Sequence, residues 1–276
     1  MQVGEMKIDW LRGGELHLDG GTMFGVVPKV LWSRKYPVNE KNQVPTRTDP
    51  IFVQFQGKNI LIDAGIGNNR LTEKQWRNFG VAEESNVLSD LRAKNLTEQD
   101  IDMVLMTHLH YDHVLGLTGK RESGEYYSVF PNAQIFVEQT EWDEMRAPNI
   151  RSKATYWKEN WESIASQVVT YKEEVEPISG IKMIRTGGHS AGHAIIELSS
   201  MGEKAIHMAD IFPTHAHQNV LWVTAFDDYP MDSIFQKQAL FRKWMDGNTW
   251  FLFYHDAKYR AIKLNALGEC VDSLLI

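Results

Sequence analysis

Short apolar runs recur along most of the chain, and polar residues, glycine and proline separate them. Runs of this kind, bounded by turn-forming residues, indicate β-strands, whereas helices require longer stretches with apolar residues at every third or fourth position. The pattern predicts a strand and turn over 7–18, broken by two glycines, and further strands over 51–55, 59–63, 101–106, 134–137, 181–185, 194–198, 204–208 and 249–254.

Longer stretches predict helices over 86–94 and 231–245, and a mainly helical insert over 138–170 that is rich in tryptophan and interrupted near Pro148. Strands and helices therefore interleave, and no short-period repeat or low-complexity linker divides the chain. We expect one α/β domain of several layers that covers residues 1–276.

Residues 26–50 form the longest segment without a clear pattern, and prolines interrupt it. A loop of this length is uncommon in a compact domain and is usually either functional or mobile. Because the segment carries Trp32 and Tyr36, we expect either a substrate loop that folds over an apolar pocket or a mobile surface connection.

The composition is ordinary for a globular protein, with 43% hydrophobic and 24% charged residues, and it excludes a disordered chain. A net charge of −7 disfavours nucleic acid as a partner. No apolar run approaches the about 20 residues needed to cross a membrane, and the N-terminus lacks a signal-peptide pattern. The single cysteine, Cys270, excludes an internal disulfide and fits a reducing compartment, so we expect a cytoplasmic protein.

The densest chemical signal is the sequence H-x-H-x-D-H, formed by His108, His110, Asp112 and His113. It follows the predicted strand 101–106, so these side chains would project from the C-terminal end of a strand. Imidazole nitrogen and carboxylate oxygen suit zinc and related divalent ions. The motif predicts a metal site, and the alternative is a histidine-rich surface loop.

Three later residues extend this signal, because each lies beside a predicted strand. His189 lies in a glycine-rich turn, Asp210 follows the strand 204–208, and His255 follows the strand 249–254. Each one alone is weak evidence, since polar residues are common in loops. Together they are expected to meet the first motif at one edge of a layered α/β fold.

The order of these motifs resembles that of the metallo-β-lactamase superfamily. H-x-H-x-D-H is followed by G-H-S-x-G-H at 188–193, then by a strand-ending aspartate and a strand-ending histidine. The sequence L-I-D-A-G at 61–65 is similar to the early D-x-G element of that superfamily, and the resemblance covers roughly residues 7–256. It implies a four-layer αββα sandwich.

The resemblance also implies a set of ligands for two divalent metal ions. Zinc is the first expectation, although manganese, cobalt or iron would accept the same donors. Asp63 would orient the ligands from behind, and we expect His193 to hold the turn around His189 by hydrogen bonds. The first ion would be bound by His108, His110 and His189 and the second by Asp112, His113 and His255, with Asp210 bridging the two.

Within the superfamily, the chain is most similar to the quorum-quenching N-acyl homoserine lactonases, including the YtnP-like group, and to the methyl parathion hydrolases. The similarity rests on the segment F-G-V-V-P at 24–28, the tryptophan-rich insert and the complete ligand set. It implies a carboxylic-ester hydrolase in which a metal-bridging hydroxide, steered by Asp112, opens a lactone ring. A phosphotriesterase of the methyl parathion hydrolase kind is the alternative.

The same resemblance implies a small-molecule lactone or ester as the substrate and a homodimer as the assembly. The pocket for an acyl chain would be apolar, with Met23, Phe24 and Trp32 as candidate lining residues. Aromatic residues of the insert are further candidates, although core packing is the favoured role for them: Tyr156, Trp157 and Trp161.

One position departs from the lactonase pattern. Many lactonases carry a tyrosine three residues after the bridging aspartate, whereas this chain has Pro213. Tyr229 is therefore a candidate proton donor for the leaving alkoxide. His215 and His217, just after Asp210, could reach the mouth of the site, but we expect them in a solvated loop.

Other classes of protein fit the pattern less well. A di-iron redox protein of the same fold would carry glutamate where His110 stands and would usually add a flavin domain. A scaffold that has lost its metals would have no reason to keep the whole ligand set. Classical β-lactamase, glyoxalase II and ribonuclease Z are less favoured, the last two because the 26–50 segment and the insert fit neither well.

Overall fold

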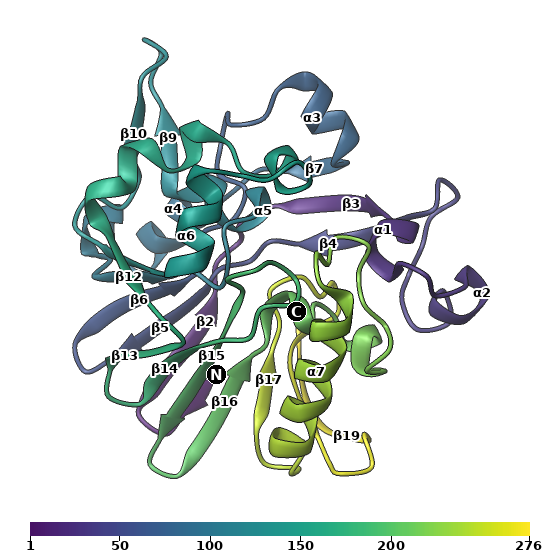
Figure 1. The fold of residues 1–276 in the computed structure, drawn as a ribbon. Coiled ribbons are helices and arrows are strands. Elements are labelled where there is room, and N and C mark those ends of the chain that lie inside the picture. Colours follow the sequence, from purple (N-terminus) through teal and green to yellow (C-terminus); the bar gives the residue numbers. More distant parts are fainter.

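Two large β-sheets lie face to face in the computed structural model, which describes residues 1–276 (Figure 1). The first sheet has the strand order β1-β2-β5-β6-β8-β11-β12. Its strands are β1 (Gln2–Val3), β2 (Met6–Trp10), β5 (Ile51–Phe55), β6 (Lys58–Ile62), β8 (Met103–Leu105), β11 (Gln134–Glu138) and β12 (Val168–Tyr171). The strands β6, β8 and β11 run parallel, so their C-terminal ends lie at one edge.

The second sheet continues directly from the first along the chain, in the order β13-β14-β15-β16-β17-β18-β19. Its strands are β13 (Glu174–Ile178), β14 (Ile181–Arg185), β15 (Ala194–Ser200), β16 (Glu203–His207), β17 (Trp250–Leu252), β18 (Tyr259–Leu264) and β19 (Cys270–Leu275). The pairing of β16 with β17 is parallel and the others are antiparallel.

The main core fills the space between the two sheets. In β2, Met6, Ile8 and Trp10 are buried while the residues between them are exposed, as expected for a strand with one face on a core. They pack with residues of the second sheet such as Met183 and Ile196.

Helices cover the outer faces of both sheets. The helices α4 (Val87–Ala93) and α6 (Gln139–Arg146) pack on the first sheet through side chains that include Trp142 and Met145. The helix α7 (Pro230–Trp244) packs on the second sheet through Phe241 and Trp244. The order helix, sheet, sheet, helix confirms the predicted αββα sandwich (Figure 1).

The expectation of a patternless loop over 26–50 is wrong for part of its length. The segment contains a short helix α2 (Lys29–Trp32) after α1 (Gly20–Phe24), and a strand β4 (Gln43–Arg47) that pairs with β3 (Glu15–Asp19). A proline at position 45 hides this strand in the sequence. It is tolerated because β4 is the edge of a small sheet in the order β4-β3-β7, the third strand being β7 (Val81–Glu83).

The insert is helical only at its start. After α6, residues 152–154, 158–160 and 162–167 form short 3₁₀ turns, and β12 begins at residue 168. The strands β18 and β19 follow the last predicted strand. The outermost, β19, is exposed along most of its length and lacks an alternating apolar pattern. The remaining elements are α3 (Glu73–Asn78), α5 (Tyr111–Val114), β9 (Thr118–Lys120) and β10 (Tyr126–Ser128).

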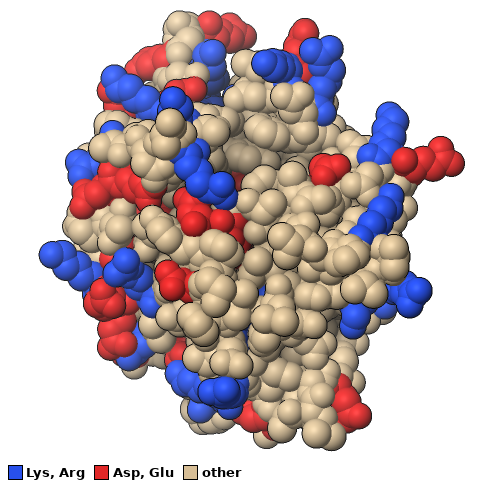
Figure 2. All heavy atoms as spheres, turned by 45° about the vertical axis from the view of Figure 1, so that its right-hand side comes forward, with Lys and Arg blue, Asp and Glu red and all other residues tan.

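One side of the molecule has few charged side chains. A broad area without charged side chains faces the viewer in Figure 2, on the side where α1, α2 and α7 lie in Figure 1. Exposed apolar side chains of this region include Val26, Val30, Leu31, Leu221, Met231 and Phe235. None of the helices combines the length and apolar character required to cross a membrane.

Candidate metal centre

The first motif lies where β8 leaves the middle of the first sheet. His108 and His110 occupy the loop after the strand, and Asp112 and His113 lie in α5. His110 has an extended backbone, with φ −61° and ψ 154°, and the helix begins at the next residue. This change of direction lets side chains two residues apart point to the same place. All four are buried.

The other candidate ligands come from the second sheet. His189 lies between β14 and β15, Asp210 in a 3₁₀ turn after β16, and His255 just beyond β17. The preceding Gly188 has φ 92°, and a Cβ on it would lie 2.8 Å from the backbone nitrogen of Ser233 in α7. Only glycine fits this close approach, which places His189 against the helix layer.

All seven predicted ligands meet at one edge of the sandwich, as expected from the strand ends. Three sets have their donor atoms within 4.8 Å of one another. These sets are His108 with His110 and His189, His108 with His113 and Asp210, and Asp112 with His113 and His255.

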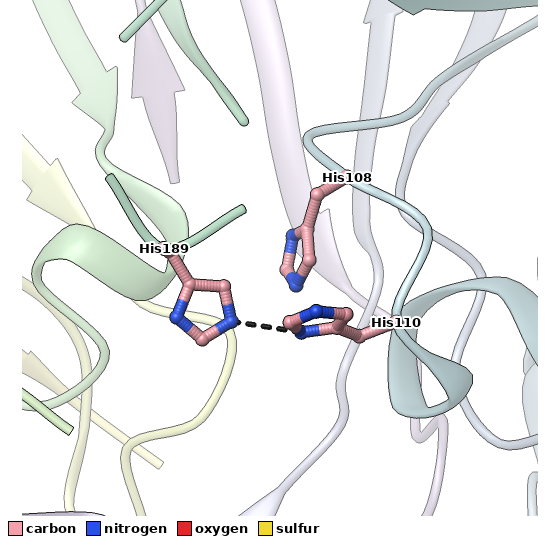
Figure 3. A group of neighbouring side chains, drawn as sticks. All are labelled: His108, His110 and His189. Carbon is pink, nitrogen blue, oxygen red and sulfur yellow. Dashed lines mark hydrogen bonds between the residues drawn. The ribbon is translucent and has the colours of Figure 1, made fainter. Parts of the chain in front are cut away.

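Individual distances show how close the donors come. His189 Nε2 lies 2.9 Å from His110 Nδ1, and in Figure 3 these two rings and His108 point toward a common centre. His113 Nε2 lies 3.0 Å from His255 Nε2. Asp210 stands between the two groups, with Oδ2 3.3 Å from His189 Nε2 and Oδ1 3.2 Å from His255 Nε2.

The donor set fits divalent cations. His108 Nε2 is buried without a hydrogen-bond partner, which is costly unless a cation satisfies it. Asp210 Oδ1 is buried against two other candidate ligands, 3.2 Å from His255 Nε2 and 3.5 Å from His113 Nε2. Imidazole nitrogens that face one another at hydrogen-bond distance are also typical of ligands around a shared ion. Nitrogen and carboxylate donors in this number suit zinc and related ions.

The outward nitrogens of three ligand imidazoles are fixed by hydrogen bonds. His113 Nδ1 lies 2.8 Å from Asp63 Oδ2, His189 Nδ1 2.8 Å from Asp227 Oδ1, and His255 Nδ1 2.7 Å from the carbonyl oxygen of Arg47. Such contacts select the tautomer and aim Nε2 at the centre. The predicted place of Asp63 behind the ligands is confirmed.

The second histidine of the glycine-rich turn also behaves as predicted. His193 Nε2 accepts a hydrogen bond from the backbone N–H of Asp210 at 3.3 Å, and its Nδ1 lies 2.8 Å from Thr186 Oγ1. Burial, with a further contribution from His189, lowers the pKa of His193 to about 3. This neutral imidazole therefore ties the turn to the segment that carries Asp210.

At His108 and Asp210, burial and neighbouring charges favour the protonation state that can bind a metal ion. Burial and the neighbouring His113 hold the pKa of His108 well below its usual range, so the imidazole is neutral at neutral pH. Burial alone would raise the pKa of Asp210, but His255 and His113 hold it well below its usual value. Burial opposes protonation of His113, but Asp210 and Asp63 raise its pKa well above its usual range, so a bound cation would replace a proton there. Neutral imidazole and ionised carboxylate are the forms that bind metals.

A cavity of about 330 Å³ opens above the ligands. His110, Asp112, His189 and Asp210 form its floor together with apolar and charged walls. The walls are formed by Leu18, Phe79, Tyr111, Arg151, Ser152, Ala154, Thr155, Ala225, Phe226 and Asp228. The ion pair between Arg151 and Asp228 joins the insert to the loop before α7.

Several predictions about this cavity are wrong. Met23, Phe24 and Trp32 do not line it, because they pack in a separate small core, where the rings of Phe24 and Trp32 stack at 4.7 Å. His217 is buried, not solvated, and stacks on Phe24. The side chain of His215 is bound to Asp256.

The structure does not bring Tyr229 to the cavity. It precedes α7, its backbone N–H donates to the carbonyl oxygen of Gly188, and its side chain is 44% exposed. The residue therefore supports the turn before His189 through its backbone. Of the tyrosines, Tyr111 lines the cavity, and its backbone N–H donates to Thr155 Oγ1 at 3.2 Å.

Sequence reasoning missed Asp227, Glu141 and Arg151. None belongs to a motif, and each acts through contacts with residues distant in the chain. The only local signal is the polar pair Asp227-Asp228 just before α7, which resembles an ordinary helix start.

Comparison with known proteins agrees with this geometry. A crystal structure of a probable metal-dependent hydrolase from Staphylococcus aureus superposes with a TM-score of 0.96 at 51% sequence identity, over 100% of this chain and 99% of that one. The dizinc quorum-quenching lactonase AidC, in complex with a product, N-hexanoyl-L-homoserine, superposes with a TM-score of 0.78 at 18% identity, over 100% and 95% of the two chains. The latter similarity establishes the fold alone.

A shorter match relates the chain to ribonuclease Z of Nanoarchaeum equitans, with 33% identity over 87 residues. It covers 30% of this chain and only 22% of that enzyme. The family model of the metallo-β-lactamase superfamily matches residues 45–253, which include every candidate ligand except His255. With the αββα sandwich and the ligand cluster at its edge, this match shows that the chain belongs to the metallo-β-lactamase superfamily.

Proposed function

We propose that the protein is a metal-dependent hydrolase that opens lactone rings, with N-acyl homoserine lactones as the expected substrates and two divalent ions, zinc in the first place, as cofactors. The observation that carries this proposal is the convergence of seven donors at one place, four of which form the floor of a cavity with partly apolar walls. His108, His110 and His189 would hold one ion and Asp112, His113 and His255 the other, with Asp210 between them.

Divalent ions in such a site supply a hydroxide nucleophile near neutral pH and polarise the carbonyl group of a substrate. The residues of the chain provide orientation. Asp112 lines the cavity, and its Oδ2 lies 3.7 Å from His255 Nε2. Its carboxylate can therefore bind a metal ion and also accept a hydrogen bond from the attacking water. Leu18, Phe79 and Phe226 offer an apolar surface to an acyl chain.

Ring opening leaves an alkoxide that needs a proton. We assign this role to Tyr111 in place of Tyr229, because Tyr111 lines the cavity together with the adjacent Asp112. Its ring is held by stacking on Phe79, with ring centroids 4.2 Å apart.

The test is hydrolysis of a series of acyl homoserine lactones and of paraoxon by metal-reconstituted protein. His108→Ala and chelated protein serve as controls. Metal-dependent lactone opening across chain lengths is expected. Negligible lactone turnover with good phosphotriester turnover would instead assign the protein to the phosphotriesterases. Inactivity on both, with metal still bound, would refute the substrate class.

A further inference from the structure

Glu141 is a buried carboxylate close to the candidate metal centre, but it is not one of the ligands. It lies in α6 and has no exposed surface. Its Oε1 accepts hydrogen bonds from the backbone N–H of Leu109 at 2.7 Å and from the hydroxyl of Tyr156 at 2.6 Å. Its Oε2 accepts from the hydroxyl of Ser190 at 2.6 Å. A buried carboxylate is costly unless its oxygens are paired, and here three uncharged donors pair them.

The partners of Glu141 are neighbours of the ligands. Leu109 stands between His108 and His110, and Ser190 follows His189 directly. The ring of Tyr156 lies 5.6 Å from that of His110. One carboxylate therefore joins three segments: the loop after β8 that carries His108 and His110, the turn between β14 and β15 that carries His189, and the part of the insert that carries Tyr156.

A second observation shows that the turn around His189 is pressed against α6. A Cβ on Gly192 would lie 2.2 Å from the backbone nitrogen of Glu141 and 2.5 Å from its Cβ, so no other residue fits there. Glu138 fixes the start of the same helix, because its Oε2 accepts from the backbone N–H of Thr140 at 2.6 Å. The place of Glu141 is thus set by the helix and by the packed turn.

The first ligand set draws its histidines from two loops. His108 and His110 come from the loop after β8, and His189 comes from the turn between β14 and β15. His110 Nδ1 and His189 Nε2 lie 2.9 Å apart although their backbones belong to different sheets (Figure 3). Their separation depends on contacts that hold the two loops together. The backbone N–H of Ala194 donates to the carbonyl oxygen of Thr107 at 2.8 Å, and the side chain of Glu141 bonds to both loops.

We infer that Glu141 is a positioning residue that holds the loop of His108 and His110 at a fixed distance from His189, and so sets the affinity of this ligand set for a divalent ion. The inference rests on the proposed metal binding by these residues and is independent of the substrate. Residues that orient ligands commonly change metal affinity when they are replaced.

The test measures metal binding in the full-length protein with Glu141→Ala and Glu141→Gln. Affinity for Zn²⁺ is obtained by competition with a chromophoric chelator, and the visible spectrum of Co²⁺-loaded protein reports ligand geometry. Glu141→Ala is expected to lower the affinity for the ion held by His108, His110 and His189 by about 10- to 100-fold, and to change the Co²⁺ spectrum. The ion held by Asp112, His113 and His255 should keep its affinity within a few-fold.

The glutamine variant provides the rescue. Its carbonyl oxygen can accept from Leu109 and Tyr156 and its amide can donate to Ser190, so affinity should return close to that of the unchanged protein. Met145→Ala is the matched control, because Met145 is buried in the same helix but packs only in the apolar core. It should lower thermal stability without changing metal affinity.

Three results would overturn the inference. Metal affinity and Co²⁺ spectrum could be unchanged in Glu141→Ala, the control could lose as much affinity as Glu141→Ala, or the unchanged protein could bind no divalent ion. If Glu141→Ala does not fold, Ser190→Ala is the deciding variant, because it removes one hydrogen bond to Glu141. The inference is refuted if this variant does not lower the affinity for the first ion several-fold. Shifted metal affinities without lactone turnover would refute only the proposed substrate.

Discussion

A buried lysine makes the stability of the fold depend on pH in a way that can be calculated. Lys237 of α7 has no exposed surface, and its Nζ donates to the carbonyl oxygens of Trp222 at 2.6 Å and His217 at 3.2 Å. Burial lowers its pKa from 10.5 to about 7, although Asp227 opposes this change. The unfolded chain therefore binds a proton between pH 7 and 10.5 that the folded protein has released.

The sign and size of this pH dependence follow from the difference in proton binding between the folded and unfolded states. Because the unfolded state binds more protons in this interval, the free energy of unfolding rises with pH by at most about 1.4 kcal/mol per pH unit, or on the order of 5 kcal/mol over the interval. Lys237→Met removes this slope and also two hydrogen bonds, which costs about 2 kcal/mol at every pH. The variant should therefore be more stable than the unchanged protein at pH 7 and less stable at pH 10, with a crossing at about pH 9.

Urea unfolding of both proteins at pH 7, 8, 9 and 10, in chelator to remove metal binding, measures the difference. Comparison with the variant cancels the titration of all other groups. A difference in unfolding free energy that is constant from pH 7 to 10 would refute the reasoning, since Lys237 would then keep the same protonation state on unfolding.

Four further predictions concern the site and the assembly. Chelation should lower the melting temperature by about 5 to 10 °C, since an ion at a hundred times its Kd stabilises by about 2.7 kcal/mol, and added Zn²⁺ should restore it in a thermal scan. Asp63→Asn, which removes the carboxylate behind His113, should weaken metal binding by about 10- to 100-fold in chelator competition. Tyr111→Phe should lower kcat for lactones by about 100-fold or more, whereas Tyr229→Phe should leave it unchanged, and equal effects would contradict the assignment of the proton donor. Sedimentation should show a dimer, and Val30→Asp in the exposed apolar surface should shift it toward monomer.

The ligands could be predicted because the first motif is dense in donor residues, and because the order of the later, individually weak candidates resembles that of a known superfamily. An apolar strand ends shortly before His108, Asp210 and His255, and the period of the pattern locates those ends to within a few residues. In a layered fold, such ends gather at one edge. Sequence therefore indicated both the residues and their meeting place before any distance was known.

The contacts that hold the ligands could not be predicted in the same way. Asp227 is 38 residues from His189, and Glu141 is 49 residues from Ser190. Nothing in the sequence near either carboxylate differs from an ordinary helix start or helix face. The burial of His217 against Phe24, 193 positions earlier, likewise depends on a small core that only the folded chain assembles.

The carboxylates behind the site come from three different parts of the sandwich. Asp63 follows β6 of the first sheet, Asp227 lies in the loop before α7, and Glu141 belongs to α6. Each is buried, and each fixes a ligand or the loop that carries it. The centre thus lies where the layers meet, and its geometry depends on how α6 and α7 pack on their sheets. Substitutions in the cores beneath those helices should then change metal affinity when they move Glu141 or Asp227.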